Sequence, residues 1–209
     1  MFELVIIVIA ARLVLPLLML RFPLIGITLT CIADWLDYNV IGSFEQYQLI
    51  DKTLDYYYLL ICAWTVRSWR DPLAKKIAWG LFVYRTIGVI VFAITNIEWT
   101  LLVFPDLFGF FWIFYLLFIR LTKMDILFIK KVTVLLVFIA ITIPKILQEY
   151  ALHIAYPYPH ITPDWVYTLL DLPLIIRFML MISIPMSILF VLARTAKHPD
   201  ATAVQPVVK

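Results

Sequence analysis

The chain has 209 residues, of which 64% are hydrophobic, and its mean hydropathy is +0.98. A soluble domain of this length does not need so much apolar surface, so the composition excludes ordinary soluble enzymes and binding modules. The formal net charge of +3 is small, and it does not point to a nucleic-acid partner.

Apolar runs of about 20 residues recur along the chain, and a run of that length crosses a bilayer as a helix. Because a spanning segment must satisfy its own backbone hydrogen bonds and alternating patterning is absent, we expect an all-α, polytopic transmembrane helical bundle. We predict about seven spans, at 2–20, 23–42, 47–66, 76–95, 99–119, 131–151 and 172–194. If 23–42 is re-entrant, about six remain.

No Gly/Ser-rich linker or change of composition divides the chain, so residues 1–194 are predicted to form a single transmembrane domain. The tail 195–209, TAKHPDATAVQPVVK, is polar and contains two prolines. Such a composition predicts a disordered tail.

The basic residues in the connections and at the ends of the predicted spans are unevenly distributed between the two sides. On one side lies Lys52 alone, and on the other lie Arg21, Arg67, Arg70, Lys75, Lys76, Arg120, Lys123, Lys130, Lys131, Arg194, Lys197 and Lys209. Cytoplasmic connections are the ones enriched in lysine and arginine. We therefore expect the N-terminus outside and the C-terminus in the cytoplasm, in a multi-pass protein of the plasma (cytoplasmic) membrane in contact with its lipid.

Four aspartates lie close together in ADWLDYNVIGSFEQYQLIDKTLDYYYLL. Asp34 and Asp37 are spaced i, i+3, and Asp51 and Asp55 are spaced i, i+4, so each pair shares one face of a helix. At 1.5 Å per residue, Asp37 and Asp51 lie about 6–8 Å below the outer surface, and Asp34 and Asp55 about 12 Å. If the two faces meet, the carboxylates converge and form a candidate site for a cation, including a divalent metal ion.

Further polar residues are predicted in the same outer half, where they would line a substrate or ion pathway. They are Arg12, Arg85, Asp106, Lys145, Glu149 and His153. A charge at the centre of a spanning helix costs about 2.5–3.5 kcal/mol, so these residues must face one another or a wet cavity. We expect Arg85 to pair with Asp55 or Asp34.

The aspartate pattern partly resembles the CDP-alcohol phosphotransferase signature, D-x-x-D-G-x-x-A-R followed by G-x-x-x-D-x-x-x-D. In ADWLDY and LIDKTLD, the matching positions are Asp34, Asp37, Asp51 and Asp55. The resemblance implies a membrane enzyme whose aspartates hold two metal ions around a pyrophosphate. Tyr38 and Tyr47 stand where the family has glycines, no Ala-Arg pair follows, and the cluster is predicted to face away from the cytoplasm.

Three functions are compatible with such a cluster. A carrier would bind a cation, a proton or a small polar substrate there, with an arginine as counter-ion. A membrane enzyme would use the carboxylates to hold a divalent metal ion. A structural or assembly subunit would use the charges as interhelical glue. The mixture of both signs at graded depth favours the carrier; the substrate, the coupling ion and the oligomeric state are left open.

The predicted topology can be tested by fusing a reporter to Lys209. Because the basic connections are expected in the cytoplasm, a reporter that is active only in the cytoplasm should be active in this fusion. An extracytoplasmic signal from Lys209 would reverse the predicted side of the aspartate cluster.

Overall fold

The structure is a computed structural model that describes residues 2–41, 47–97, 99–123 and 131–150, and positions 187, 188, 190, 191 and 194. Within these ranges every regular element is helical, which confirms the all-α prediction for the described part of the chain. The elements are α1 (Phe2–Val14), the 3₁₀ helix η1 (Leu15–Leu20), α2 (Pro23–Ile41), α3 (Tyr47–Val66), α4 (Pro72–Thr95), α5 (Trp99–Val103), α6 (Leu107–Thr122) and α7 (Lys131–Tyr150).

Three segments of the described chain are long and apolar enough to cross a membrane, namely Glu3–Leu20, Pro72–Thr95 and Trp99–Leu121. Shorter apolar helices cover Pro23–Asp34 and Leu135–Leu147. The predicted spans 23–42 and 47–66 do form helices, α2 and α3. Helix α3 carries three charged residues within its span, Asp51, Lys52 and Asp55, whereas α2 carries two, Asp34 and Asp37. The predicted span 172–194 and the tail 195–209 lie almost wholly outside the described residues.

Two boundaries differ from the prediction because of local backbone chemistry. Helix α4 begins at Pro72 instead of 76, because the Asp71 carboxylate accepts hydrogen bonds from the backbone N–H groups of Leu73 and Ala74, both at 2.9 Å. Such an N-cap followed by proline is a common helix start. The predicted span 99–119 is interrupted at Phe104–Asp106, since Pro105 has no N–H to donate and Asp106 caps α6.

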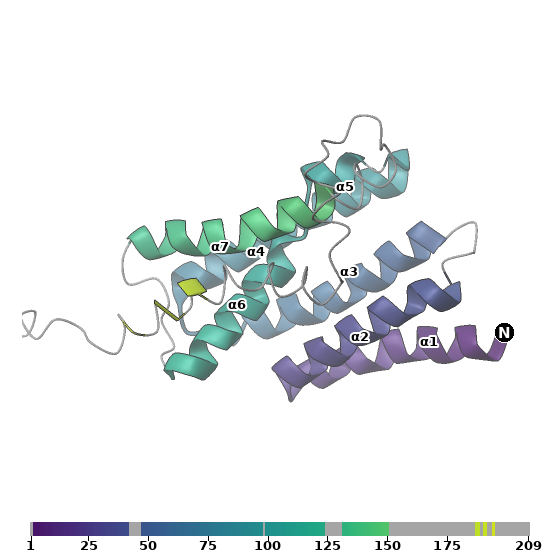
Figure 1. Cartoon of the computed structure of the whole chain (residues 1–209), viewed down its shortest axis with the longest axis horizontal. Coiled ribbons are helices and arrows are strands. Elements are labelled where there is room, and N and C mark those ends of the chain that lie inside the picture. Colours follow the sequence, from purple (N-terminus) through teal and green to yellow (C-terminus); the bar gives the residue numbers. More distant parts are fainter. Residues whose placement is uncertain are drawn as a thin grey trace, which may run out of the picture.

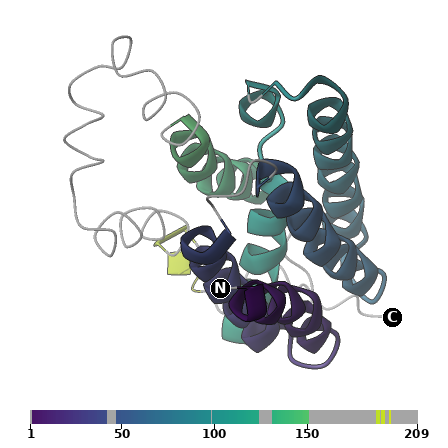
Figure 2. The ribbon, with the colours of Figure 1, turned by 90° about the vertical axis from the view of Figure 1, so that its right-hand side faces the viewer.

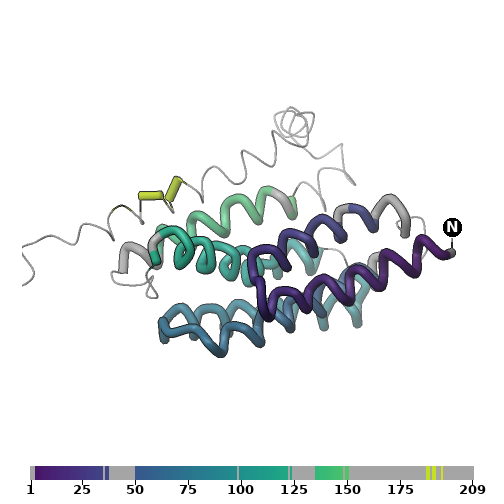
Figure 3. The backbone as a smooth tube through the Cα atoms, turned by 90° about the horizontal axis from the view of Figure 1, so that it is seen from below, coloured from purple at the N-terminus to yellow at the C-terminus, as the bar shows by residue number. Residues whose placement is uncertain are grey.

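The described helices pack side by side along one long axis. Helix α1 with η1 runs antiparallel to α2 along one side of the molecule, and α7 lies on the opposite side (Figure 1). Helix α6 crosses between these two layers, and it contacts α2, α3, α4 and α7 (Figure 2). Seen from below, α1 and α2 lie side by side in the half of the bundle that contains the N-terminus (Figure 3).

The densest part of the core surrounds α6. Its aromatic side chains Phe108, Phe111, Trp112 and Tyr115 have no measurable exposure. The ring of Tyr115 lies 4.0 Å, centroid to centroid, from that of Trp69, which belongs to the turn between α3 and α4. The Trp112 indole N–H donates to the Thr65 hydroxyl at 2.9 Å, so its polar atom is satisfied inside the core.

The outward surface of α1 is apolar, as it would be beside lipid. Leu4, Ile6, Ile7 and Val14 are each at least half exposed. On α4, Val83, Ile90 and Ile94 are similarly exposed. Apolar surface this extensive is typical of a helix face that contacts a membrane or another protein.

The packing of α4 against the α5–α6 break can be tested at Gly88. A Cβ atom added there would overlap the side chain of Phe104, whereas a Cβ at Gly80, on the same helix, meets nothing within 4 Å. We expect Gly88→Ala to lower the free energy of unfolding by about 1–3 kcal/mol through overpacking. Gly80→Ala should be neutral or stabilising by up to about 1 kcal/mol.

The measurement is the thermal unfolding midpoint of each variant in one detergent. A Gly88→Ala midpoint equal to that of Gly80→Ala would contradict the close approach of α4 to Phe104.

Candidate functional site

A single buried guanidinium organises the polar residues of the first three helices. Arg12 on α1 is 2% exposed. Its Nη1 donates to Asp37 and, at 2.9 Å, to Asp51. Its Nη2 lies 2.6 Å from Asp34 and 2.7 Å from Asp55. The four predicted aspartates therefore do converge, and a guanidinium lies at the point where they meet.

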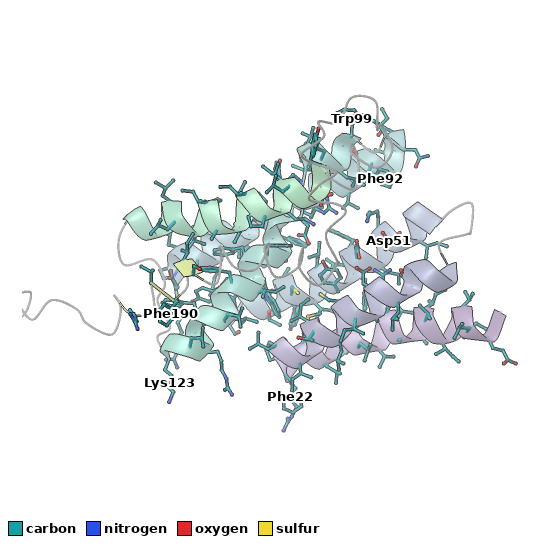
Figure 4. All side chains as sticks on the ribbon, viewed as in Figure 1. Phe22, Asp51, Phe92, Trp99, Lys123 and Phe190 are labelled. Atoms are coloured by element: carbon teal, nitrogen blue, oxygen red, sulfur yellow. The ribbon has the colours of Figure 1, made fainter. Side chains whose placement is uncertain are left out.

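Helix geometry explains why Arg12 reaches two other helices. Arg12 lies about ten residues before the turn at 21–22 and Asp34 about twelve residues after it, so antiparallel packing brings them to a similar depth. Helix α3 contacts α1 and η1, and this packing brings Asp51 and Asp55 to the same guanidinium. Figure 4 marks Asp51 on α3, in the half of the bundle that contains the N-terminus.

Lys52 is a further member of this cluster, which the sequence interpretation left outside it. Its ammonium lies 2.6 Å from Asp51 and 3.4 Å from Asp55. The i, i+3 spacing of Lys52 and Asp55 was visible in the sequence and would have predicted the contact. We call Arg12, Lys52 and the four aspartates the Arg12 cluster.

Exposure is graded across the Arg12 cluster. The side chain of Asp37 is 1% exposed and that of Asp51 is 10% exposed. Asp55 is exposed to 19% and Asp34 to 45%. Asp34 is therefore the member from which a ligand or a proton can reach the buried carboxylates.

Three carboxylates of the cluster also satisfy the simplest geometric requirement for a metal ion. One oxygen each from Asp34, Asp37 and Asp51 lies within 4.8 Å of the others. Hard divalent cations such as Mg²⁺ and Ca²⁺ prefer oxygen ligands of this type. The same three residues are already engaged by Arg12, so a metal ion would have to compete with the guanidinium for their oxygens.

Arg85 does not make the predicted pair with Asp34 or Asp55, because those carboxylates are taken by Arg12. Its Nη1 instead donates to the backbone carbonyl of Phe104 at 2.6 Å, and its buried Nε has no hydrogen-bond partner among the described residues. The neighbouring Tyr84 hydroxyl donates to the carbonyl of Val103. These carbonyls end α5 next to Pro105, where no helical N–H is available to them. Side chains of α4 therefore donate hydrogen bonds to the carbonyls at the end of α5.

The remaining described pathway residues lie at the start of α6 and on α7. Asp106 accepts from the backbone N–H of Gly109 at 2.9 Å and from the Tyr58 hydroxyl at 3.1 Å, so it caps α6. Lys145 and Glu149 form a buried ion pair at 2.8 Å, and the Lys145 ammonium lies 5.4 Å from the Phe110 ring centroid. His153 lies outside the described residues. Of the predicted pathway residues, Arg12 contacts the four aspartates, whereas Arg85 contacts the α5–α6 break, Asp106 caps α6 and Lys145 pairs with Glu149.

Comparison with protein-family models, with curated protein sequences and with solved structures gives no match to this chain. The similarity to the CDP-alcohol phosphotransferases is therefore confined to the spacing of the aspartates. Any functional conclusion must come from the chemistry of the residues themselves.

The role of Arg12 can be tested by replacing it with leucine. The change leaves buried carboxylates on α2 and α3 without the cation they share. Breaking a buried ion pair on one side costs about 3–5 kcal/mol, so we expect a clearly lower unfolding midpoint in detergent. The unfolding midpoint of Arg12→Lys should lie between those of the wild type and Arg12→Leu, since one ammonium cannot serve four carboxylates as a planar guanidinium does.

Arg21→Leu is the matched control, because Arg21 follows η1 and is exposed. Equal midpoints for Arg12→Leu and Arg21→Leu would show that the guanidinium does not hold the three helices together.

Proposed function

We propose that this chain is a multi-pass integral membrane protein whose Arg12 cluster binds a cation, a proton or a small polar substrate in a carrier-type role. The observation that carries the proposal is the sharing of one buried guanidinium by four carboxylates from two helices. In an apolar chain, such a concentration of charge is costly, and it is typical of substrate and ion pathways.

The charge balance of the cluster supports a ligand or proton site. Within the described part of the chain, Arg12 and Lys52 are the cations that contact the four aspartates. Even if Asp37 is counted as neutralised by its own contacts, three carboxylates share these two positive charges. Like charges this close in an apolar setting cannot all stay ionised without a bound cation or proton.

The gradient of exposure supports access from one side. Asp34, the most exposed member, lies next to buried carboxylates, so a cation attracted to Asp34 has further ligands within a few ångströms. The ion pair of Lys145 with Glu149, together with Arg85, extends the polar residues toward α4 and α7. These residues form the proposed continuation of the pathway, to which the sequence adds His153.

The distribution of charged residues supports the proposed orientation. Phe22 and Lys123, which mark the basic connections after η1 and α6, both lie on the side of Asp51 remote from the N-terminus, toward the opposite end of the bundle (Figure 4). We call this end, formed by residues 21–23, 67–71 and 119–123, the basic end. In the proposed arrangement it faces the cytoplasm, the Arg12 cluster faces outward, and about seven spans cross the plasma membrane.

A metal-dependent membrane enzyme is the second candidate, favoured by the mutual approach of the Asp34, Asp37 and Asp51 oxygens. The residues fit a divalent cation by donor type. In that case a metal ion would polarise a phosphoryl group or activate a water held against the carboxylates. Arg12 would have to release its carboxylates first, which separates this candidate from the carrier.

The proposal predicts that cations stabilise the protein through the Arg12 cluster. Na⁺, Mg²⁺, Mn²⁺ or Ca²⁺ titration should raise the unfolding midpoint of the wild type, because a ligand that binds only the folded state stabilises it by mass action. At a hundred times its dissociation constant the gain is about 2.7 kcal/mol. The gain should disappear in Asp51→Asn/Asp55→Asn. If the cluster takes up a proton instead of a cation, lowering the pH from 8 to about 5 should raise the unfolding midpoint of the wild type relative to that of Asp51→Asn/Asp55→Asn.

Asp71→Asn serves as the control, since Asp71 is a buried acidic residue that caps α4 and asparagine caps equally well. It should keep the full cation response. If neither a cation nor pH separates the double variant from the wild type, the aspartates serve only to join the helices and the carrier role is wrong. A response confined to divalent ions and strengthened in Arg12→Gln would favour the metal enzyme.

A further inference from the structure

A cavity opens at the basic end of the bundle, away from the Arg12 cluster. Its volume is about 360 Å³, within the range of small-molecule sites. One wall is polar and is formed by Thr65, Ser68 and Arg70 at the end of α3 and in the following turn; the other wall is formed by α6. We call this cavity the basic-end pocket.

The hydroxyl groups of the polar wall have already used their hydrogens. Ser68 donates to the carbonyl of Thr65 at 2.7 Å, and Thr65 donates to the carbonyl of Cys62 at 2.7 Å. A hydroxyl has two acceptor lone pairs, so Ser68 can still accept, and Thr65, which accepts from the Trp112 indole, has one lone pair left. These oxygens would repel a phosphate group and accept hydrogen bonds from the hydroxyls of a ligand.

Positive charge borders the pocket from three connections. The exposed Arg70 lies in the wall itself. Two residues before the lining residue Pro23 is Arg21, and directly after the lining residue Ile119 is Arg120; both are exposed. Basic residues at the end of a helical bundle attract the anionic lipids of a membrane by about 1 kcal/mol each.

The opposite wall is apolar. Tyr115, Leu116 and Ile119 of α6 line it, and α6 is among the most apolar segments of the chain. The pocket therefore has a cationic rim, acceptor oxygens and an apolar wall. A free phosphate ester would leave the apolar wall without a partner, whereas a lipid satisfies all of these surfaces.

We propose that the basic-end pocket binds one anionic phospholipid with a polyol headgroup, such as phosphatidylglycerol. The phosphodiester lies against Arg70, the headgroup hydroxyls donate to Ser68 and Thr65, and the first carbons of the acyl chains pack on Leu116 and Ile119. This site is separate from the Arg12 cluster and does not depend on the carrier role.

Native mass spectrometry of the purified full chain in detergent tests this assignment, with phosphatidylglycerol, phosphatidylcholine and glycerol 3-phosphate as probes. Wild type should retain one phosphatidylglycerol and bind it at least about fivefold more tightly than phosphatidylcholine, the factor that corresponds to one basic residue. Arg70→Gln should lose about that factor. Leu116→Trp, which fills the apolar side, should lose the lipid altogether while keeping its unfolding midpoint.

Arg67→Gln is the control, because Arg67 is an exposed arginine of the same turn whose guanidinium lies 4.1 Å over the Trp64 ring, outside the pocket. It should bind the lipid as the wild type does. Three results would each overturn the proposal: equal binding of phosphatidylcholine, equal losses in Arg67→Gln and Arg70→Gln, or glycerol 3-phosphate binding as tightly as the lipid.

Discussion

The burial of Arg12 is the constraint on which the first half of the molecule depends. A guanidinium cannot lie in an apolar bundle without partners, since the cost of removing it from water amounts to several kcal/mol. Its planar fork of N–H donors can serve several carboxylates at once, and here it serves four. Because those carboxylates come from α2 and α3, the contact sets the depth of both helices against α1. A slip by one turn, about 5.4 Å, would break every one of these bonds.

The same interaction limits how these helices can meet a membrane. Helix α2 carries Asp34 and Asp37 among apolar residues, and α3 carries Asp51, Lys52 and Asp55. Lipid cannot satisfy these groups, so the charged faces of α2 and α3 must turn inward, toward Arg12. Helices α1 and α4 carry apolar side chains on their outer faces and can meet lipid over their full length. The contact of Arg12 with the aspartates therefore decides which helices turn a charged face inward.

Depth counted along the sequence predicted the convergence of the aspartates, because helix rise and short connections leave little freedom. The prediction that Arg85 pairs with Asp34 or Asp55 was wrong, and the reason lies in the α5–α6 break. Proline at position 105 removes a helical N–H donor and interrupts the helix. Which groups then donate to the carbonyls of Val103 and Phe104 depends on where α4 lies. Lys52 was missed for the opposite reason: its contacts with Asp51 and Asp55 are local, yet its shallow position suggested a residue in solvent.

The two buried arginines show which part of the bundle can change its charge. Arg85 donates to a backbone carbonyl, and a carbonyl neither titrates nor binds a proton near neutral pH, so this contact is fixed once α4 packs against the break. Arg12 donates to carboxylates that outnumber their cations in the described part of the chain, and a carboxylate can take up a proton or a cation without any movement of the backbone. An exchange of ligand at the Arg12 cluster therefore alters the attraction that holds α1 to α2 and α3, whereas the contact of Arg85 with the helix break stays as it is. In the proposed carrier role, coupling between a bound cation or proton and helix packing is therefore expected at Arg12 and not at Arg85.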